Sequence, residues 1–360
     1  MASFDVEPIR EWGLFPLEGP CMIAGPCSAE SESQMMATAS FLHETGVNVL
    51  RAGIWKPRTH PGAFEGAGPE ALEWLCNAGR RFGLRTCTEV AGAAHVEECL
   101  RVGVDAVWIG ARTSGNPFFV QEIADALSGT DIPVFVKNPL NPDLELWTGT
   151  LERLSLAGLR RIALVHRGFS IPGHSRYRNE PEWNLILQMR SMHPEIPILC
   201  DPSHMGGDSR HVPELSRISL DMGYDGLMVE VHPDPSSALS DSRQQLSPDQ
   251  FRSMLSTLSS RNCDSDDYVY RKRLEELRAR IDSLDDEMMR ILSERMETCR
   301  EIGELKSEYN VSIVQSSRWD KVLADAVASA EDYRLDSSFV RDLFNLIHEA
   351  SVKVQNHKTL

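Results

Sequence analysis

Short apolar runs alternate with amphipathic segments over roughly the first 260 residues of the chain. The apolar runs, which are rich in β-branched and aromatic residues, cover 21–24, 47–52, 85–90, 106–109, 134–136, 162–165, 198–200 and 227–231. The segments between them have a helical period and cover 31–45, 69–82, 93–102, 117–127, 143–157, 182–192, 212–222 and 247–258. Eight strands, each followed by a helix within about 250 residues, predict a (β/α)8 (TIM) barrel. An open doubly wound sheet is the alternative, but its Gly-x-Gly-x-x-Gly sequence is missing.

A different pattern follows the polar stretch 256–267, because no β-rich run appears after it. Apolar residues at 3-4-3-4-3 spacing mark one face of a long helix that extends to about Glu308: Leu274, Leu277, Ile281, Leu284, Met288 and Ile291. A second helix is expected from Ser317, and a third, capped by Asp336 or Ser337, through Val354. The long stripe exceeds what two short helices can cover, so we expect this small all-α domain to form a homodimer, or a higher oligomer, through its long helix. The predicted division is a barrel over 1–258, a linker over 259–269 and a helical domain over 270–360.

Composition and charge narrow the classes of protein to which this chain can belong. The net charge of −16 without a basic block excludes binding of nucleic acid or an anionic membrane by bulk electrostatics. The N-terminus has no apolar signal core, and no run of about 18 apolar residues occurs, so we expect a cytoplasmic protein. The eight cysteines form no Cys-x-x-Cys pair, which argues against a zinc knuckle and indicates reduced thiols.

Candidate functional residues are those that follow each predicted strand, because the active site of such a barrel lies at the carboxyl ends of its strands. All eight ends carry an ionisable or metal-binding side chain, which unrelated surface charges do not explain. Five of these side chains are cations: Lys56, Arg58, Arg112, Lys137 and Arg167. Crowded cations suit phosphate and carboxylate oxygens. The pattern therefore predicts substrates that together carry several negative charges, such as two phosphorylated compounds.

A second set of strand-end residues has the donors of a metal site. It consists of Cys27, His204, Glu230 and Asp241. One thiolate, one imidazole and two carboxylates accept several divalent ions, including manganese, iron, cobalt and zinc. A buried structural cysteine is the alternative, and for Cys27 taken alone it is the better interpretation. The position of Cys27 among turn residues, opposite His204, favours the metal.

Six motifs at these ends are Gly25-Pro26-Cys27-Ser28, Lys56-Pro57-Arg58-Thr59, Gly110-Ala111-Arg112, Arg167-Gly168, Asp201-Pro202-Ser203-His204 and Glu230-Val231-His232-Pro233. In this order and spacing, the first 255 residues resemble the 3-deoxy-D-arabino-heptulosonate 7-phosphate (DAHP) synthases of the type I-beta group. Those enzymes condense phosphoenolpyruvate with erythrose 4-phosphate in the first step of the shikimate pathway. A sister family makes 3-deoxy-D-manno-octulosonate 8-phosphate and usually shows Asn-Arg-Ser after the lysine. Pro57-Arg58-Thr59 therefore favours the heptulosonate enzyme, although the loop 169–181 departs from the expected lid.

The resemblance also implies roles for individual residues. It makes Cys27, His204, Glu230 and Asp241 the ligands of a divalent metal, with manganese favoured over iron, cobalt and zinc. It places phosphoenolpyruvate on Arg112, Lys137 and Arg167, with Lys56 nearby, and the aldose phosphate on Arg58 and Thr59. Arg51 is expected to bind substrate as well, and Lys56 and Lys137 are the expected catalytic residues of the barrel.

The helical region has its own recurring residues, which are Arg278, Arg295, Lys306, Arg318, Ser351 and Gln355. At these intervals the region from Arg271 resembles the all-α chorismate mutases, which convert chorismate to prephenate. The resemblance implies that the arginines and Ser351 bind the substrate, and that Lys306 and Gln355 act on its ether oxygen. Arg295 and Lys306 share one helix face, whereas Arg278 lies about 100° away and would serve a partner's pocket.

Three interpretations of the helical region remain open. It is a mutase within a bifunctional enzyme, a domain that only senses prephenate or chorismate, or a dimerisation coil. Gln315 and Trp319 stand where many mutases carry acids, which keeps the second interpretation open. Only about 20 residues precede the first strand, too few for a regulatory domain, so feedback inhibition is expected to enter through the mutase pocket, with prephenate as the ligand.

Overall fold

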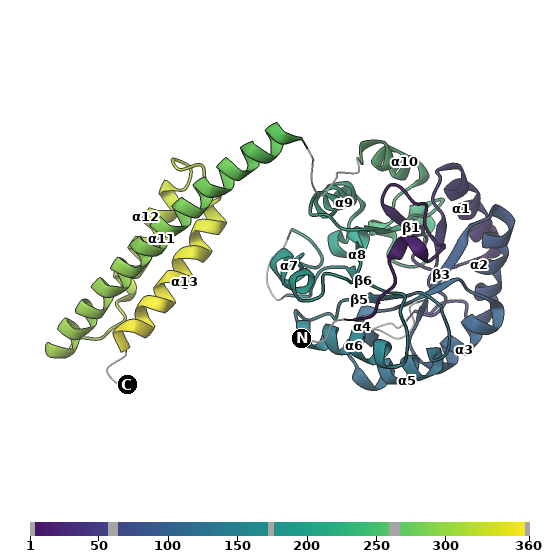
Figure 1. Cartoon of the computed structure of the whole chain (residues 1–360), viewed down its shortest axis with the longest axis horizontal. Coiled ribbons are helices and arrows are strands. Elements are labelled where there is room, and N and C mark those ends of the chain that lie inside the picture. The colour runs from purple at the N-terminus through teal and green to yellow at the C-terminus, as the bar shows by residue number, and fades with distance from the viewer. Residues whose placement is uncertain (1–3, 57–63, 172–175, 259–266, 357–360) are drawn as a thin grey trace. The chain divides into compact units, whose positions relative to one another are not determined.

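The computed structural model describes residues 4–56, 64–171, 176–258 and 267–356, and Figure 1 shows its course. The chain forms two compact units, Met1–Cys263 and Asp264–Leu360. Most of the predicted linker over 259–269 lies outside the described residues.

Eight parallel strands close into a barrel in chain order, which confirms the predicted fold class. They are β1 (Cys21–Gly25), β2 (Val49–Arg51), β3 (Arg85–Val90), β4 (Ala106–Ile109), β5 (Val134–Lys137), β6 (Ile162–His166), β7 (Ile198–Cys200) and β8 (Gly226–Glu230). Strand β8 pairs with β1, and the register sets Glu230 opposite Gly25. The parallel order brings all eight carboxyl ends to one mouth.

Helices surround the barrel in Figure 1 and lie where the apolar period predicts them. They are α1 (Glu32–Glu44), α2 (Pro69–Phe82), α3 (Ala93–Val102), α5 (Pro117–Leu127), α6 (Leu144–Leu156), α7 (Trp183–Met192), α9 (Val212–Asp221) and α10 (Pro248–Thr257). Polar caps start several of them: the side chains of Ser31 and Asp143 accept backbone N–H groups of α1 and α6, and Ser247 forms a capping box with Gln250.

Short elements without a predicted counterpart follow several strands. They are α4 (Ala111–Ser114), α8 (Pro202–Gly206) and the 3-10 turns η2 (Ser209–His211), η3 (Pro235–Ser237) and η4 (Ser242–Gln244). None of them spans enough residues to show a helical period. Two matter for the site, because α4 carries Arg112 and α8 carries His204.

The barrel interior is filled at its amino end. Residues before β1, including the turn η1 (Ile9–Glu11), send Ile9, Trp12 and Phe15 into the apolar cluster inside the strands. The ring centroids of Trp12 and Phe15 lie 5.8 and 6.4 Å from that of Phe135 on β5. A ligand therefore has access from the carboxyl ends of the strands.

The second unit consists, in its described part, of the helices α11 (Tyr268–Glu308), α12 (Ser316–Ser329) and α13 (Ser337–Asn356). Helix α13 packs against both others. Asp267 caps α11 by accepting the N–H of Tyr270 at 2.8 Å. The apolar stripe of α11 stays about half exposed within this chain, Leu284 at 55% and Met288 at 51%. Among all described helices, none has the length and hydropathy needed to cross a membrane.

Candidate active site

A buried arginine lies at the centre of the barrel mouth. Arg51, the last residue of β2, donates from Nη2 to Glu230 Oε1 at 3.0 Å, and both side chains are at most 1% exposed. Its guanidinium also lies over the ring of Trp108, 4.8 Å from the centroid. Its Nε and Nη1 atoms have no hydrogen-bond partner in the described part of the chain. Buried N–H donors are rarely left unpaired, so these two atoms mark a place for an anionic ligand.

One carboxylate, that of Asp201, contacts both Lys137 and His204. Asp201 belongs to one of the six sequence motifs, but no role was predicted for it. Asp201 Oδ2 lies 2.6 Å from Lys137 Nζ and 2.8 Å from His204 Nδ1. Burial alone would raise the pKa of Asp201, but His204 and Lys137 together hold it well below its usual range. Asp201 is therefore an anion that fixes both side chains toward the mouth.

Arg167 and Arg112 extend the cationic side of the mouth. Arg167 follows β6 and is 6% exposed, and its backbone N–H donates to Asn138 Oδ1 at 2.8 Å. Burial lowers the pKa of Arg167 to about 10; Asp201 opposes this shift, and the nearby cations of Arg178 and Arg112 add to it. The guanidinium remains charged at neutral pH. Arg58 and Thr59 lie outside the described residues.

Lys56 contacts the predicted metal ligand Cys27. Its Nζ atom donates to the Cys27 carbonyl oxygen at 2.9 Å and approaches Sγ at 3.0 Å. Burial raises the pKa of the Cys27 thiol to about 12, with Glu230 adding to the shift and Lys56 opposing it. A divalent cation at this thiol would favour its deprotonated form instead.

The four predicted metal ligands come together in two pairs. Cys27 Sγ lies 3.4 Å from Asp241 Oδ2, and His204 Nε2 lies 3.6 Å from Glu230 Oε1. Among the described residues, no three His, Cys, Asp or Glu side chains are arranged to hold one ion as they stand. The donor set nevertheless fits a divalent cation by its chemistry, because a thiol, an imidazole and two carboxylates meet at one mouth. In this structure the donor atoms contact Lys56 and neighbouring polar groups instead of an ion.

Two further residues that sequence reasoning missed hold these carboxylates. Gln244 donates from Nε2 to Glu230 Oε2 at 2.7 Å, and Arg178 donates from Nη1 to Asp241 Oδ1 at 3.2 Å. In the sequence, only the unusual loop 169–181 draws attention to Arg178, and no motif or spacing indicates a role for Gln244.

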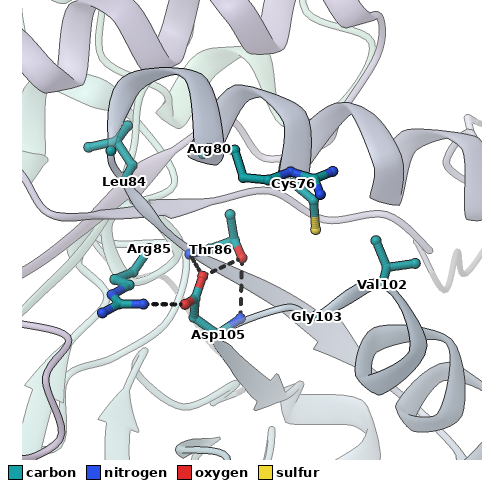
Figure 2. A pocket seen from close by; sticks show the side chains of 10 residues that line it. Cys76, Arg80, Leu84, Arg85, Thr86, Val102, Gly103 and Asp105 are labelled. Atoms are coloured by element: carbon teal, nitrogen blue, oxygen red, sulfur yellow. Dashed lines mark hydrogen bonds and ion pairs between the residues drawn. The ribbon is translucent and has the colours of Figure 1, made fainter.

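A cavity of about 380 Å³ at the other end of the barrel differs in character. Figure 2 shows its lining, with Arg85 at the start of β3 and Asp105 just before β4. Asp105 pairs with Arg85 at 2.9 Å and accepts hydrogen bonds from Thr86. The amino ends of strands contribute to stability rather than catalysis in this fold, so we assign this cluster a structural role.

The helical unit brings four of its six predicted residues together in two pairs. Arg295 Nη1 donates to Ser351 Oγ at 2.5 Å, and Lys306 Nζ lies 3.4 Å from Gln355 Oε1. Lys306 and Gln355 line a cavity of about 320 Å³. The other four predicted residues are not among its lining residues: Arg278, Arg295, Arg318 and Ser351. The Trp319 ring stacks on His348 with centroids 3.9 Å apart.

The closed barrel with a cation-lined mouth defines a (β/α)8 enzyme, and the helical unit is a second domain. The sequence model of the DAHP synthetase I family matches residues 18–264, so the chain belongs to that family. The chorismate mutase type II family matches residues 277–356. The resemblances drawn from the motifs are thereby confirmed, and the two domains carry the two corresponding enzyme activities.

The barrel is similar to curated relatives of two names and to solved structures of a DAHP synthase. A phospho-2-dehydro-3-deoxyheptonate aldolase of Thermotoga maritima is 35% identical over 234 residues, 65% of this chain and 67% of the relative. A 2-dehydro-3-deoxyphosphooctonate aldolase of Stenotrophomonas maltophilia is 30% identical over 261 residues, 66% of this chain and 89% of the relative. The crystal structure of the Thermotoga maritima DAHP synthase superposes with a TM-score of 0.60 at 35% identity, covering 65% of this chain and 67% of that one. A truncated form of the Thermotoga maritima synthase gives a TM-score of 0.57 at 32% identity, covering 65% of this chain and 83% of that one.

Proposed function

We propose that the barrel condenses phosphoenolpyruvate, erythrose 4-phosphate and water to DAHP and phosphate in a metal-dependent reaction. The observation that carries this proposal is Arg51, a fully buried cation beside Glu230 with two N–H donors that have no partner among the described residues. Lys137 and Arg167 lie at the same mouth and are themselves nearly buried. Such preorganised cations suit a small ligand that carries both a phosphate and a carboxylate.

In this proposal the residues of the chain mainly position the reactants. Arg51, Arg112, Lys137 and Arg167 hold phosphoenolpyruvate, with Lys56 near its reacting end, so that its enol carbon faces the aldehyde. Arg58 and Thr59 bind the sugar phosphate. After carbon–carbon bond formation, water adds to the electron-poor carbon that bears the phosphate, and the same cations stabilise the negative charge of the phosphate as it leaves.

Cys27, His204, Glu230 and Asp241 would hold the divalent ion, manganese first, with iron, cobalt and zinc as alternatives. Bound there, the ion would polarise the aldehyde oxygen as a Lewis acid. Support comes from the donor types and from the two pair distances of 3.4 and 3.6 Å.

The experiment for the barrel is a phosphate-release assay on the full chain. Release should require phosphoenolpyruvate and a four-carbon aldose phosphate together. A five-carbon aldose phosphate tests the second candidate, an octulosonate synthase, which several relatives named as octonate aldolases favour. Faster turnover of the five-carbon sugar would replace the first assignment by the second.

For the helical unit we propose the rearrangement of chorismate to prephenate. This reaction needs no acid, base or cofactor, only a site that holds a dicarboxylate and stabilises the breaking ether bond. Arg295, Arg318 and Ser351 would bind the carboxylates, and Lys306 and Gln355, 3.4 Å apart, would contact the ether oxygen. Chorismate consumption by the full chain, lost in Lys306→Ala, tests this against a domain that only binds prephenate or chorismate.

A homodimer through α11 completes the proposal, in a cytoplasmic enzyme. The stripe residues Ile281, Leu284 and Ile291 are 56, 55 and 51% exposed within one chain. A second copy would cover them, and Arg278 would then serve the partner's pocket. Prephenate bound in the mutase pocket would inhibit the synthase. A monomeric mass in solution would contradict the dimer.

A further inference from the structure

Arg178 joins the two carboxylates of the proposed metal site through one nitrogen atom. Its Nη1 atom donates to Asp241 Oδ1 at 3.2 Å and to Gln244 Oε1 at 2.9 Å. Gln244, which is 1% exposed, in turn donates from Nε2 to Glu230 Oε2 at 2.7 Å. One guanidinium therefore reaches both Asp241 and Glu230.

These contacts take one oxygen of each carboxylate and orient the other. The second oxygen of Asp241 lies 3.4 Å from Cys27 Sγ. The second oxygen of Glu230 lies 3.6 Å from His204 Nε2. Arg178 and Gln244 thus leave the oxygens that face the other two donors unengaged. Of these, Glu230 Oε1 also accepts a hydrogen bond from Arg51 at 3.0 Å.

The loop that carries Arg178 is fixed to the helix that carries His204. The N–H groups of Arg178 and Asn179 donate to the carbonyl oxygens of Gly206 and Met205 at 3.2 and 3.0 Å. The Asn179 side chain donates to the His204 carbonyl oxygen at 2.7 Å. Gly207 has φ +67°, and a Cβ atom there would lie 2.3 Å from Arg178 Cβ, so only glycine permits this approach. Residues 178 and 179 thus connect three of the four proposed ligands.

We propose that Arg178 is a positioning residue of the metal site, which orients Asp241 directly and Glu230 through Gln244. This inference rests on the proposed function of the four ligands. Hydrogen bonds to metal-binding carboxylates raise metal affinity, and their loss typically weakens binding about 10–100-fold. Coulomb repulsion between a cation and the ion would act in the opposite direction, but Arg178 is 49% exposed, so solvent screens it.

The test is a Mn²⁺ titration of the full-length apoprotein, with free Mn²⁺ followed by electron paramagnetic resonance. Arg178→Ala should raise the dissociation constant about 10–100-fold. Arg178→Lys keeps a cationic donor on a shorter side chain and should fall between Arg178→Ala and the wild type. Arg176→Ala is the matched control. Arg176 and Arg178 line one cavity of about 590 Å³, but Arg176 pairs with Glu214 on α9. It should stay within about twofold of the wild type.

Unchanged or tighter Mn²⁺ binding by Arg178→Ala would overturn the proposal. Cys27→Ala separates this failure from that of the ligand set. If Cys27→Ala binds Mn²⁺ as the wild type does, the ligand set is wrong and the role of Arg178 falls with it. If Cys27→Ala binds weakly while Arg178→Ala matches the wild type, only the role of Arg178 is wrong. Should Arg178→Ala lower the thermal midpoint of the apoprotein, the pair Arg178→Lys and Arg176→Lys decides, since only the first should weaken binding.

Discussion

The guanidinium of Arg51 shows how single residues prepare the mouth for an anion. It is buried beside one carboxylate and one indole ring, while two of its donors have no partner among the described residues. Unpaired buried donors cost free energy. A bound anion removes that cost, so substrate binding should stabilise the arrangement that the fold already holds.

Arg112 supplies a direct test of the proposed phosphoenolpyruvate site. Arg112→Ala should raise the KM for phosphoenolpyruvate and lower kcat together, because the same contact binds the substrate and orients its reacting carbon. A charge-assisted hydrogen bond contributes about 1.5–3 kcal/mol, so kcat/KM should fall roughly 10–150-fold. Steady-state kinetics with each substrate varied provides the measurement. An effect confined to erythrose 4-phosphate would show that the two anion sites are interchanged.

His166 predicts a pH dependence of stability. Burial lowers the pKa of His166 from 6.5 to about 3, with Arg167 adding to the shift, and Nδ1 lies 2.9 Å from the Tyr224 hydroxyl. The native pKa is below the unfolded one, so between these values the unfolded chain binds the extra proton and stability falls as pH falls. Acidification from pH 7 to 5 should cost about 2 kcal/mol from this group.

Urea unfolding of the wild type and His166→Asn at both pH values measures this contribution. The variant should lose about 2 kcal/mol less than the wild type on acidification. Equal losses in the two proteins would mean that His166 is not held neutral by the fold.

At the scale of elements, strand starts contribute stability and strand ends contribute chemistry. Asp105 joins the starts of β3 and β4, since its Oδ2 accepts the N–H and hydroxyl of Thr86 at 2.8 and 2.9 Å (Figure 2). Thr86 is 3% exposed, whereas the Arg85 side chain that pairs with the other oxygen is 57% exposed. The buried hydrogen bonds should therefore outweigh the ion pair.

Asp105→Ala should lower the free energy of unfolding by about 1–3 kcal/mol, because the Thr86 groups lose their acceptor. Arg85→Ala removes the same ion pair and should cost less than about 1 kcal/mol. Chemical denaturation measures both. A larger loss in Arg85→Ala than in Asp105→Ala would reverse the assigned order.

The fold could be predicted from the sequence because its elements leave local signals. The apolar runs before Lys137 and Glu230 have the length of strands, and strand order then places their ends at one mouth. Arg178 and Gln244 could not be predicted in the same way. Arg178 lies in an irregular segment and Gln244 in the three-residue turn η4, and their contact joins residues 66 positions apart. A contact of this kind produces no periodic pattern in the sequence, so the sequence does not predict it.

The whole molecule combines a net charge of −16 with cations at the barrel mouth. The acidic surface repels anions in general, while the mouth attracts them locally.

The chain also joins an early and a late activity of one pathway. Such an arrangement suits control of the first by the product of the second.

Prephenate should therefore inhibit phosphate release by the full chain, several-fold to about 100-fold for a coupling free energy of about 1–3 kcal/mol. Arg295→Ala should abolish this inhibition, since Arg295, which contacts Ser351, is proposed to bind a carboxylate of the mutase ligand. Arg290→Ala, on the same helix but paired with Glu294 at 3.6 Å, is the control and should keep it. Synthase rates against prephenate concentration measure the effect. Full inhibition of Arg295→Ala would place the sensor elsewhere.

The proposed condensation at the barrel mouth depends on a metal ion that Cys27 helps to bind. The most direct measurement is phosphate release from phosphoenolpyruvate and erythrose 4-phosphate, after chelation and again after Mn²⁺ is returned. Cys76→Ala is the control, because Cys76 lines the cavity at the opposite end of the barrel. The wild type and Cys76→Ala should lose activity on chelation and regain it with Mn²⁺, whereas Cys27→Ala should stay inactive in both conditions. Near-normal phosphate release by chelated Cys27→Ala would show that the reaction needs no metal ion bound by Cys27.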